Sequence, residues 1–318
     1  MDTFVSYYQQ AAFRPGVEYL IGDTRIVFSY RDVVSFNIDC NKAASGEIAR
    51  LCRALEEGLD LTNGLPQFAE FVRHAHDILQ ALDRYGFLTE TAPPAPGRSI
   101  SGAAFWNEVA AFVERAKLKA RPILYEALLS GRASRAALIR YVREYYHVVR
   151  AGPGIIAGSL AHVGDRTTRG ILEQFLASEL GHDKLIASAL ASVGIGEAEI
   201  ARALPLPETF SIISALQVGA DQEPLTFKAL VFLMEEASPE FHRAFVSACE
   251  YEGLPAAFWR PITDHAGIND EGAHGSISER LLAKVETVTQ EERYVVLKQA
   301  MTMIENLMAL EHALLRDP

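Results

Sequence analysis

The chain has few cysteines and no long apolar run. Its three cysteines, Cys40, Cys52 and Cys249, are widely separated and lack metal-binding spacing, so neither a disulfide framework nor a cysteine-ligated metal is expected. No apolar run approaches the roughly 20 residues that cross a bilayer, so we expect no membrane partner. The start, Met1-Asp2-Thr3-Phe4, shows no basic segment followed by an apolar one. We therefore expect no secretory signal and a cytoplasmic location.

The chain also lacks an excess of basic residues. Its formal net charge is −11, which argues against a nucleic-acid partner. A Walker loop, a dinucleotide fingerprint and a nucleophile elbow are missing as well. What remains is a composition of 49% hydrophobic and 22% charged residues over 318 positions. That is typical of a globular protein too long for one ordinary core, so two domains are expected.

Residues 1–90 read as a small α/β domain of winged-helix type. Val17–Ile21 and Arg25–Tyr30 are β-prone runs around Gly22 and Asp23, which predicts a hairpin. A third strand is predicted at Val33–Ile38, and helices at 43–59 and 65–85. Residues 91–99 form the predicted linker, because three prolines and a glycine between Thr91 and Arg98 cannot continue a helix.

Residues 100–318 read as an all-α bundle, because helical periodicity recurs and no β-rich segment stands out. The predicted helices lie near 103–129, 134–150, 154–163, 167–193, 197–203, 208–219, 223–237, 239–252, 256–282 and 289–315. Pro153, between Gly152 and Gly154, is expected to separate the second and third of these helices and to open space near a site.

The most informative motif is Glu179-Leu180-Gly181-His182-Asp183, inside the predicted helix 167–193. Residues three apart on a helix point the same way. Glu179 and His182 therefore pair a carboxylate with an imidazole, as helical bundles do when they hold two iron or manganese ions. One such pair occurs by chance, so a metal site requires further inward-facing ligands from other helices.

Other predicted helices offer such ligands. Glu144 lies among Leu138, Tyr141, Tyr145 and Val148, and Glu235 ends an apolar run. A third segment, Asp264–His274, holds two histidines and three acidic residues. Together these segments supply carboxylates and imidazoles on four helices, which a two-metal site needs.

The Tyr-x-x-Glu-Tyr-Tyr helix, the Glu-x-x-His helix and the late His/Asp/His segment resemble the haem-oxygenase-like superfamily over residues 100–315. This superfamily includes pyrroloquinoline quinone synthase, thiaminase II and di-iron oxidases. The resemblance implies a haem-oxygenase-like bundle preceded by the small α/β domain. It also implies a set of metal ligands: Glu144, Glu179, His182, Glu235, His265, Asp270 and His274. Glu236 is the alternative to Glu235.

The last segment departs from the family pattern. His265 and His274 are nine residues apart, about half a turn around a regular helix, where the family has seven. Both face one site only if the helix bulges, and Gly267 and Gly272 permit that. Asp270 is the preferred acidic ligand because it lies four residues before His274. In the alternative, Glu271 and His274 form the working pair and His265 is not a ligand.

His147 follows Glu144 at the same three-residue spacing. It is predicted as a catalytic group in the substrate pocket or as a ligand replacing His265. A hydrogen-bonded core histidine is the competing interpretation.

The resemblance implies a non-haem di-iron enzyme that binds two Fe(II) ions and uses O2 as co-substrate. We expect an oxidase or oxygenase in a biosynthetic pathway, acting on an amine, an amino-acid-like molecule or a peptide-borne substrate. One alternative is a cofactor-independent oxidase resembling pyrroloquinoline quinone synthase, with histidines as acid and base. The other is a non-catalytic binding or scaffold protein.

The first domain is similar to small peptide-recognition modules that bind a leader peptide as an added strand. This similarity predicts a leader or carrier peptide at an exposed edge around Arg25–Tyr30. A purely stabilising winged-helix module is the alternative. The superfamily resemblance also implies a homodimer.

Overall fold

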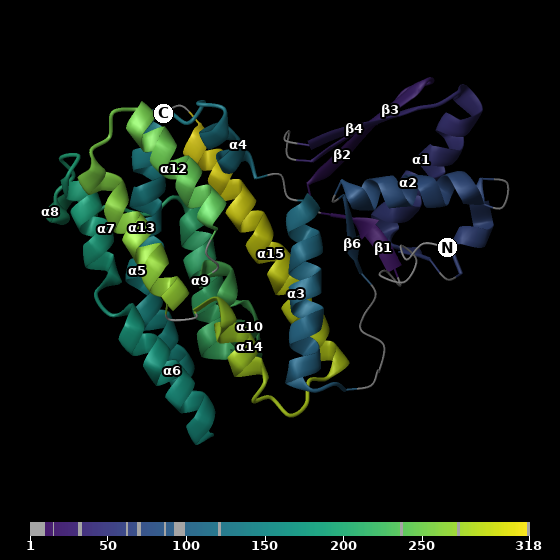
Figure 1. Ribbon diagram of the computed structural model, residues 1–318. Coiled ribbons are helices and arrows are strands. Elements are labelled where there is room, and N and C mark those ends of the chain that lie inside the picture. Colours follow the sequence, from purple (N-terminus) through teal and green to yellow (C-terminus); the bar gives the residue numbers. More distant parts are fainter. Residues whose placement is uncertain are drawn as a thin grey trace. The chain divides into compact units, whose positions relative to one another are not determined.

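The computed structural model describes residues 10–14, 16–30, 34–61, 63–68, 71–85, 87–91, 99–119, 122–235, 238–271 and 274–316. The chain forms two compact units, Met1–Pro96 and Gly97–Pro318, which are described separately (Figure 1). The predicted linker falls mostly on residues 92–98, which lie outside the described residues.

In the first unit, one antiparallel sheet has the order β2-β3-β4. Its strands are β2 (Val17–Ile21), β3 (Arg25–Tyr30) and β4 (Val34–Asp39). The predicted hairpin is confirmed, because Ile21 pairs with Ile26 next to the turn. The predicted edge around Arg25–Tyr30 is wrong, because β3 is the central strand and is paired on both sides. Peptide binding at β2 or β4 stays a prediction.

A second small sheet, with the order β5-β1-β6, was missed by the sequence interpretation. Its strands are β1 (Gln10–Phe13), β5 (Leu59–Asp60) and β6 (Leu88–Glu90). These strands are two to four residues long, too short for a period of two to stand out. Pairing between distant segments defines them: Ala11 pairs with both Leu59 and Glu90.

Two helices cover the apolar side chains of this unit. The helical segments are α1 (Lys42–Glu57), η2 (Leu65–Phe68) and α2 (Val72–Arg84). The Asn41 side chain accepts a hydrogen bond from the backbone N–H of Ala44 and so begins α1. Phe28, Leu51, Leu79 and Phe87 are fully buried in one cluster. The unit therefore has its own hydrophobic core.

The second unit is helical, so the expected mainly-α class is confirmed. Its segments are α3 (Gly102–Lys119), α4 (Ile123–Leu129), α5 (Arg135–Leu160), α6 (Arg166–Glu179), α7 (His182–Ala191), α8 (Glu197–Ile200), α9 (Pro207–Gln222), α10 (Pro224–Leu230), α11 (Phe232–Glu235), α12 (Pro239–Tyr251), α13 (Ala256–Glu271), η3 (His274–Ser276), α14 (Ile277–Leu282) and α15 (Gln290–Leu315). In the described part of this unit, β-structure is limited to one bridge between Ile100 and Val288. None of the described helices has the length and apolar character that a membrane span requires.

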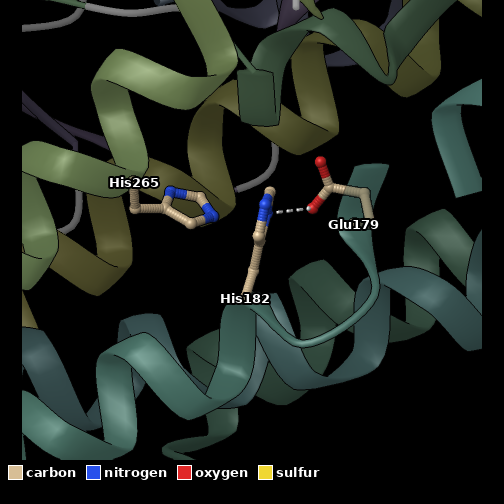
Figure 2. A group of neighbouring side chains, drawn as sticks. All are labelled: Glu179, His182 and His265. Atoms are coloured by element: carbon tan, nitrogen blue, oxygen red, sulfur yellow. Dashed lines mark hydrogen bonds and ion pairs between the residues drawn. The ribbon is translucent and has the colours of Figure 1, made fainter. Parts of the chain in front are cut away.

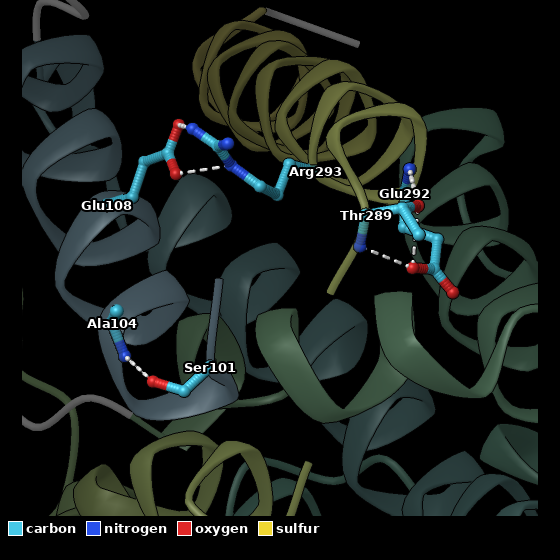
Figure 3. A network of polar contacts seen from close by, with 6 residues as sticks. All are labelled: Ser101, Ala104, Glu108, Thr289, Glu292 and Arg293. Carbon is cyan, nitrogen blue, oxygen red and sulfur yellow. Dashed lines mark hydrogen bonds and ion pairs between the residues drawn. The ribbon is translucent and has the colours of Figure 1, made fainter. Parts of the chain in front are cut away.

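Polar contacts fix where two of these helices begin and join them (Figure 3). The Thr289 and Glu292 side chains form a capping box at the start of α15. The Ser101 hydroxyl accepts a hydrogen bond from the Ala104 N–H at the start of α3. Arg293 donates to both carboxylate oxygens of Glu108, at 2.8 and 3.0 Å. This two-pronged contact ties α15 to α3.

The expected break at Pro153 does not occur. Helix α5 runs through Pro153 for 26 residues. A proline removes one backbone hydrogen bond of the helix, but α5 packs against α6, α7 and α9 along its length. This packing holds the helix together where the sequence predicted two.

The expected continuous helix over 167–193 is also wrong. Helix α6 ends at Glu179 and α7 begins at His182. Between them Gly181 has a φ of 91°, in the left-handed region that glycine adopts most readily. Leu180, predicted to lie on the apolar face, is 65% exposed. The motif Glu179–Asp183 therefore spans a turn between two helices.

Candidate metal centre

Three potential ligands meet inside the bundle. Ligand atoms of Glu179, His182 and His265 all lie within 4.8 Å of one another. Their side chains point toward one another in Figure 2. Each of the three residues is at most 6% exposed. Buried carboxylates and imidazoles are costly unless they are paired or bind a metal, so this grouping indicates a specific role.

Direct contacts hold the three side chains together. His182 Nδ1 lies 3.2 Å from Glu179 Oε2. The rings of His182 and His265 meet edge to face, with centroids 4.6 Å apart and an interplanar angle of 81°. The predicted Glu-x-x-His pair is thus completed by a histidine more than 80 residues later in the chain.

The local folding of the chain explains this placement. Because Gly181 turns the backbone, Glu179 is the last residue of α6 and His182 is the first residue of α7. Helix α7 packs along α13, which carries His265. A turn and a helix pair therefore converge, where the sequence interpretation expected one face of one helix.

Tyr145 contacts the Nδ1 side of the His265 ring. Its hydroxyl lies 2.7 Å from His265 Nδ1, and the two rings meet edge to face. Burial raises the pKa of Tyr145 well above its ordinary value, and Tyr141, Glu235 and Glu179 raise it further. The phenol therefore stays protonated near neutral pH. Since Nδ1 is engaged by Tyr145, Nε2 is the ring nitrogen of His265 that is available to a metal.

A small cavity, partly open to solvent, adjoins this group. Tyr145, Glu179, Glu235 and His265 form its polar lining. Glu235 ends α11 and is half-buried. The predicted ligand Glu235 thus shares a cavity with Glu179 and His265, although it lies outside the group of three.

Helix α5 contributes a regular face to the cavity: Tyr145, Val148, Val149, Gly152, Ile155 and Ile156. These residues follow the spacing of one helical face. Gly152 leaves room there because it has no side chain. The space expected near Pro153 therefore exists without a break in the helix.

The structure places Glu144, a predicted ligand, away from the group. Glu144 is buried, and its Oε2 accepts a hydrogen bond of 2.9 Å from the backbone N–H of Leu206. Leu206 lies between Pro205 and Pro207, which have no N–H of their own. Glu144 thus satisfies the backbone donor at the start of α9. Tyr145, its neighbour, is the α5 side chain that faces the cavity.

His147, the predicted catalytic group, lies on the same side of α5 as Glu144 and does not line the cavity. It is buried, and its ring meets that of Tyr146 edge to face. Burial lowers the pKa of His147, with Glu144 acting in the opposite direction and Arg150 and Arg143 in the same direction. The geometry favours the interpretation of His147 as a core histidine.

The ligands predicted in the segment Asp264–His274 lie mostly outside the described residues. The side chains of Asp270, Glu271 and His274 lie outside the described residues, as does the whole of Glu236. His265 itself is described and lies beside His182. The structure therefore brings His265 into the group of three, and the roles of Asp270, Glu271 and His274 stay predictions.

The donor set fits iron. Two imidazoles and one carboxylate are the donors that non-haem Fe(II) takes in proteins. The three side chains are buried, so few waters compete for the ion, and Tyr145 orients one imidazole from outside. The chemistry of the residues present thus matches a non-haem iron site.

Two features were missed by the sequence interpretation. Tyr145 was treated only as a neighbour of Glu144, and Gly181 as part of a helix. A usable signal for Tyr145 was present, because the apolar and small residues at 149, 152 and 156 share its face and not that of Glu144. The αL turn at Gly181 had only the glycine itself as a signal.

A family model described as "Iron-containing redox enzyme" matches residues 139–308, more than half of the chain. No curated protein matches. The solved structures that match include a domain of unknown function with a haem oxygenase-like fold from Shewanella denitrificans OS217. The similarity covers 68% of this chain and 90% of that chain, with 17% identity and a TM-score of 0.48.

Proposed function

The chain belongs to the family of iron-containing redox enzymes, and from this premise we propose that it is a non-haem di-iron oxidase or oxygenase that uses O2. The observation that carries the proposal is the buried group of Glu179, His182 and His265. One carboxylate and two imidazoles leave coordination positions open for O2 and substrate. The proposal includes a role in a biosynthetic pathway. The expected substrate is an amine, an amino-acid-like molecule or a peptide-borne group.

Each residue of the site has a role in this proposal. Glu179, His182 and His265 would hold one ion, and Glu235, which lines the same cavity, would serve a second. Further ligands to the second ion would come from Asp270 or His274. When bound, iron(II) supplies the electrons with which O2 is reduced.

The surrounding residues orient and protect the site. Tyr145 fixes the ring of His265 through Nδ1 and so directs Nε2 toward the ion. The buried carboxylate of Glu179 offsets positive charge, and its contact with His182 keeps the two ligands together. The apolar side chains of the cavity exclude water from the reacting substrate.

The test is iron content after anaerobic loading with Fe(II) and removal of unbound metal. We expect about two irons per chain, as a site built on this bundle motif holds, and a visible absorption change on adding O2. Glu179→Ala and His182→Ala should each lose iron.

Matched controls are Glu173→Ala, an exposed glutamate of α6, and His162→Ala, an exposed histidine. Both should keep the wild-type iron content. A wild-type protein that binds no iron would contradict the proposal. Oxidation that survives strong chelation would favour the cofactor-independent alternative.

A further inference from the structure

The cavity beside the metal group has two chemically different parts. Three of its four polar side chains are clustered, because Tyr145 contacts His265 and His265 lies beside Glu179. The remaining lining is apolar and comes from several helices. It includes Val148 and Ile155 of α5, Phe175 of α6, Leu216 of α9 and Phe227 of α10.

The apolar part offers no partner for a charged group. Among the lining residues that the structure describes, none is a lysine or an arginine, and the polar side chains are Glu235 and the cluster of Tyr145, Glu179 and His265. An ammonium or carboxylate group lodged away from that cluster would lose its hydration without a compensating contact, which is costly. A hydrocarbon group gains free energy in the same place.

We infer that the substrate places an aliphatic hydrocarbon portion in this cavity, with its reacting carbon beside Glu179 and His265. The inference rests on the proposed function, because the metal group defines which end of the cavity is reactive. It narrows the expected substrate: an amine or a peptide-borne group would enter with an apolar chain and not with a second charge.

Gly152 gives a direct way to fill the cavity. It lines the cavity from α5, and a Cβ built on it meets no atom within 4 Å. A side chain added there therefore begins in open space at the wall of the cavity. Gly154 lies on the same helix, is exposed, and is equally unobstructed, but it does not line the cavity. Gly152→Leu and Gly154→Leu are therefore a matched pair.

The probe is a series of n-alkanols, from 1-butanol to 1-octanol, titrated calorimetrically into the Fe(II)-loaded protein without O2. A neutral head group leaves the hydrocarbon chain as the variable. We expect affinity to rise about fourfold for each added methylene until the cavity is full. Gly152→Leu should shorten the longest chain that gains affinity, and Gly154→Leu should behave as wild type.

Affinity that does not depend on chain length would overturn the inference, as would the same response in Gly152→Leu and in wild type. Circular dichroism of both glycine variants checks that each is folded. Iron content, measured on the same samples, separates this outcome from failure of the proposed function. A protein that binds iron but shows no length dependence keeps the metal site and loses the aliphatic substrate.

Discussion

Glu144 and His147 on α5 have the same three-residue spacing as Glu179 and His182, and all four side chains are buried. In the first pair the helix is regular, and the carboxylate accepts the Leu206 N–H. In the second pair a turn at Gly181 interrupts the helix, and His265 from α13 joins the two side chains. The difference teaches that the spacing alone does not make a metal site. A third buried side chain, that of His265 on a neighbouring helix, distinguishes the two pairs.

The largest difference between the two regions is expected when one histidine is removed from each. His265→Ala should weaken metal binding by more than the roughly 10–100-fold that loss of an outer partner costs, because it deletes a ligand. His147→Ala should leave metal affinity unchanged. Titration with Co(II), followed by its visible absorption, measures both. Equal losses in the two variants would place His147 at the site and contradict the geometry.

Replacing the tyrosine that faces the cavity should have the next largest effect. Tyr145→Phe keeps the ring but removes the hydroxyl that holds His265 Nδ1, so metal affinity should fall about 10–100-fold. The bands of the Co(II) form should also shift as the imidazole reorients. Tyr141→Phe is the control, since Tyr141 stacks on Tyr145 without lining the cavity. Affinity unchanged in Tyr145→Phe would remove Tyr145 from the site.

The sequence predicted elements and ligand types better than it predicted connections. Periodicity located most helices of the bundle, because their apolar faces are long. Spacing paired Glu179 with His182, and the family resemblance added His265, with its loss left open as an alternative. It could not show that α5 survives Pro153 or that the chain turns at Gly181. Both outcomes depend on packing between helices that are distant in sequence.

The sequence also did not show which residues of α5 face the cavity. Glu144 and Tyr145 are adjacent, and one residue corresponds to about 100° of helix rotation. The family resemblance favoured the carboxylate, whereas the face shared by Val149, Gly152 and Ile156 favours the tyrosine. The spacing of small and apolar residues was thus a better guide to the cavity than the chemistry of one side chain.

Glu144 should prove structural and not metal-binding. Glu144→Ala leaves the part-buried Leu206 N–H without its carboxylate acceptor, which should lower the free energy of unfolding by about 1–2 kcal/mol. Urea unfolding of the metal-free protein measures the change, and metal affinity should stay at the wild-type value. Glu173→Ala, on an exposed face, should change stability by less than about 0.5 kcal/mol. Metal lost in Glu144→Ala at unchanged stability would return Glu144 to the ligand set.

The smallest expected change concerns the turn that separates the two kinds of pair. Gly181 has a φ of 91°, and a side chain in the left-handed region costs about 1–2 kcal/mol. Gly181→Ala should therefore destabilise the protein by that amount, although a Cβ there meets no neighbour. Gly170 is also unobstructed but lies within α6, so Gly170→Ala should instead stabilise the protein by about 0.5–1 kcal/mol.

Urea unfolding measures both changes in stability. Changes of opposite sign would establish that backbone conformation, and not lost space, makes glycine necessary at 181. Metal affinity should fall only in Gly181→Ala, because a relaxed turn moves Glu179 away from His182. If both variants were stabilised, the segment would be the continuous helix that its periodicity predicts, and the two Glu-x-x-His pairs would differ only in what faces them.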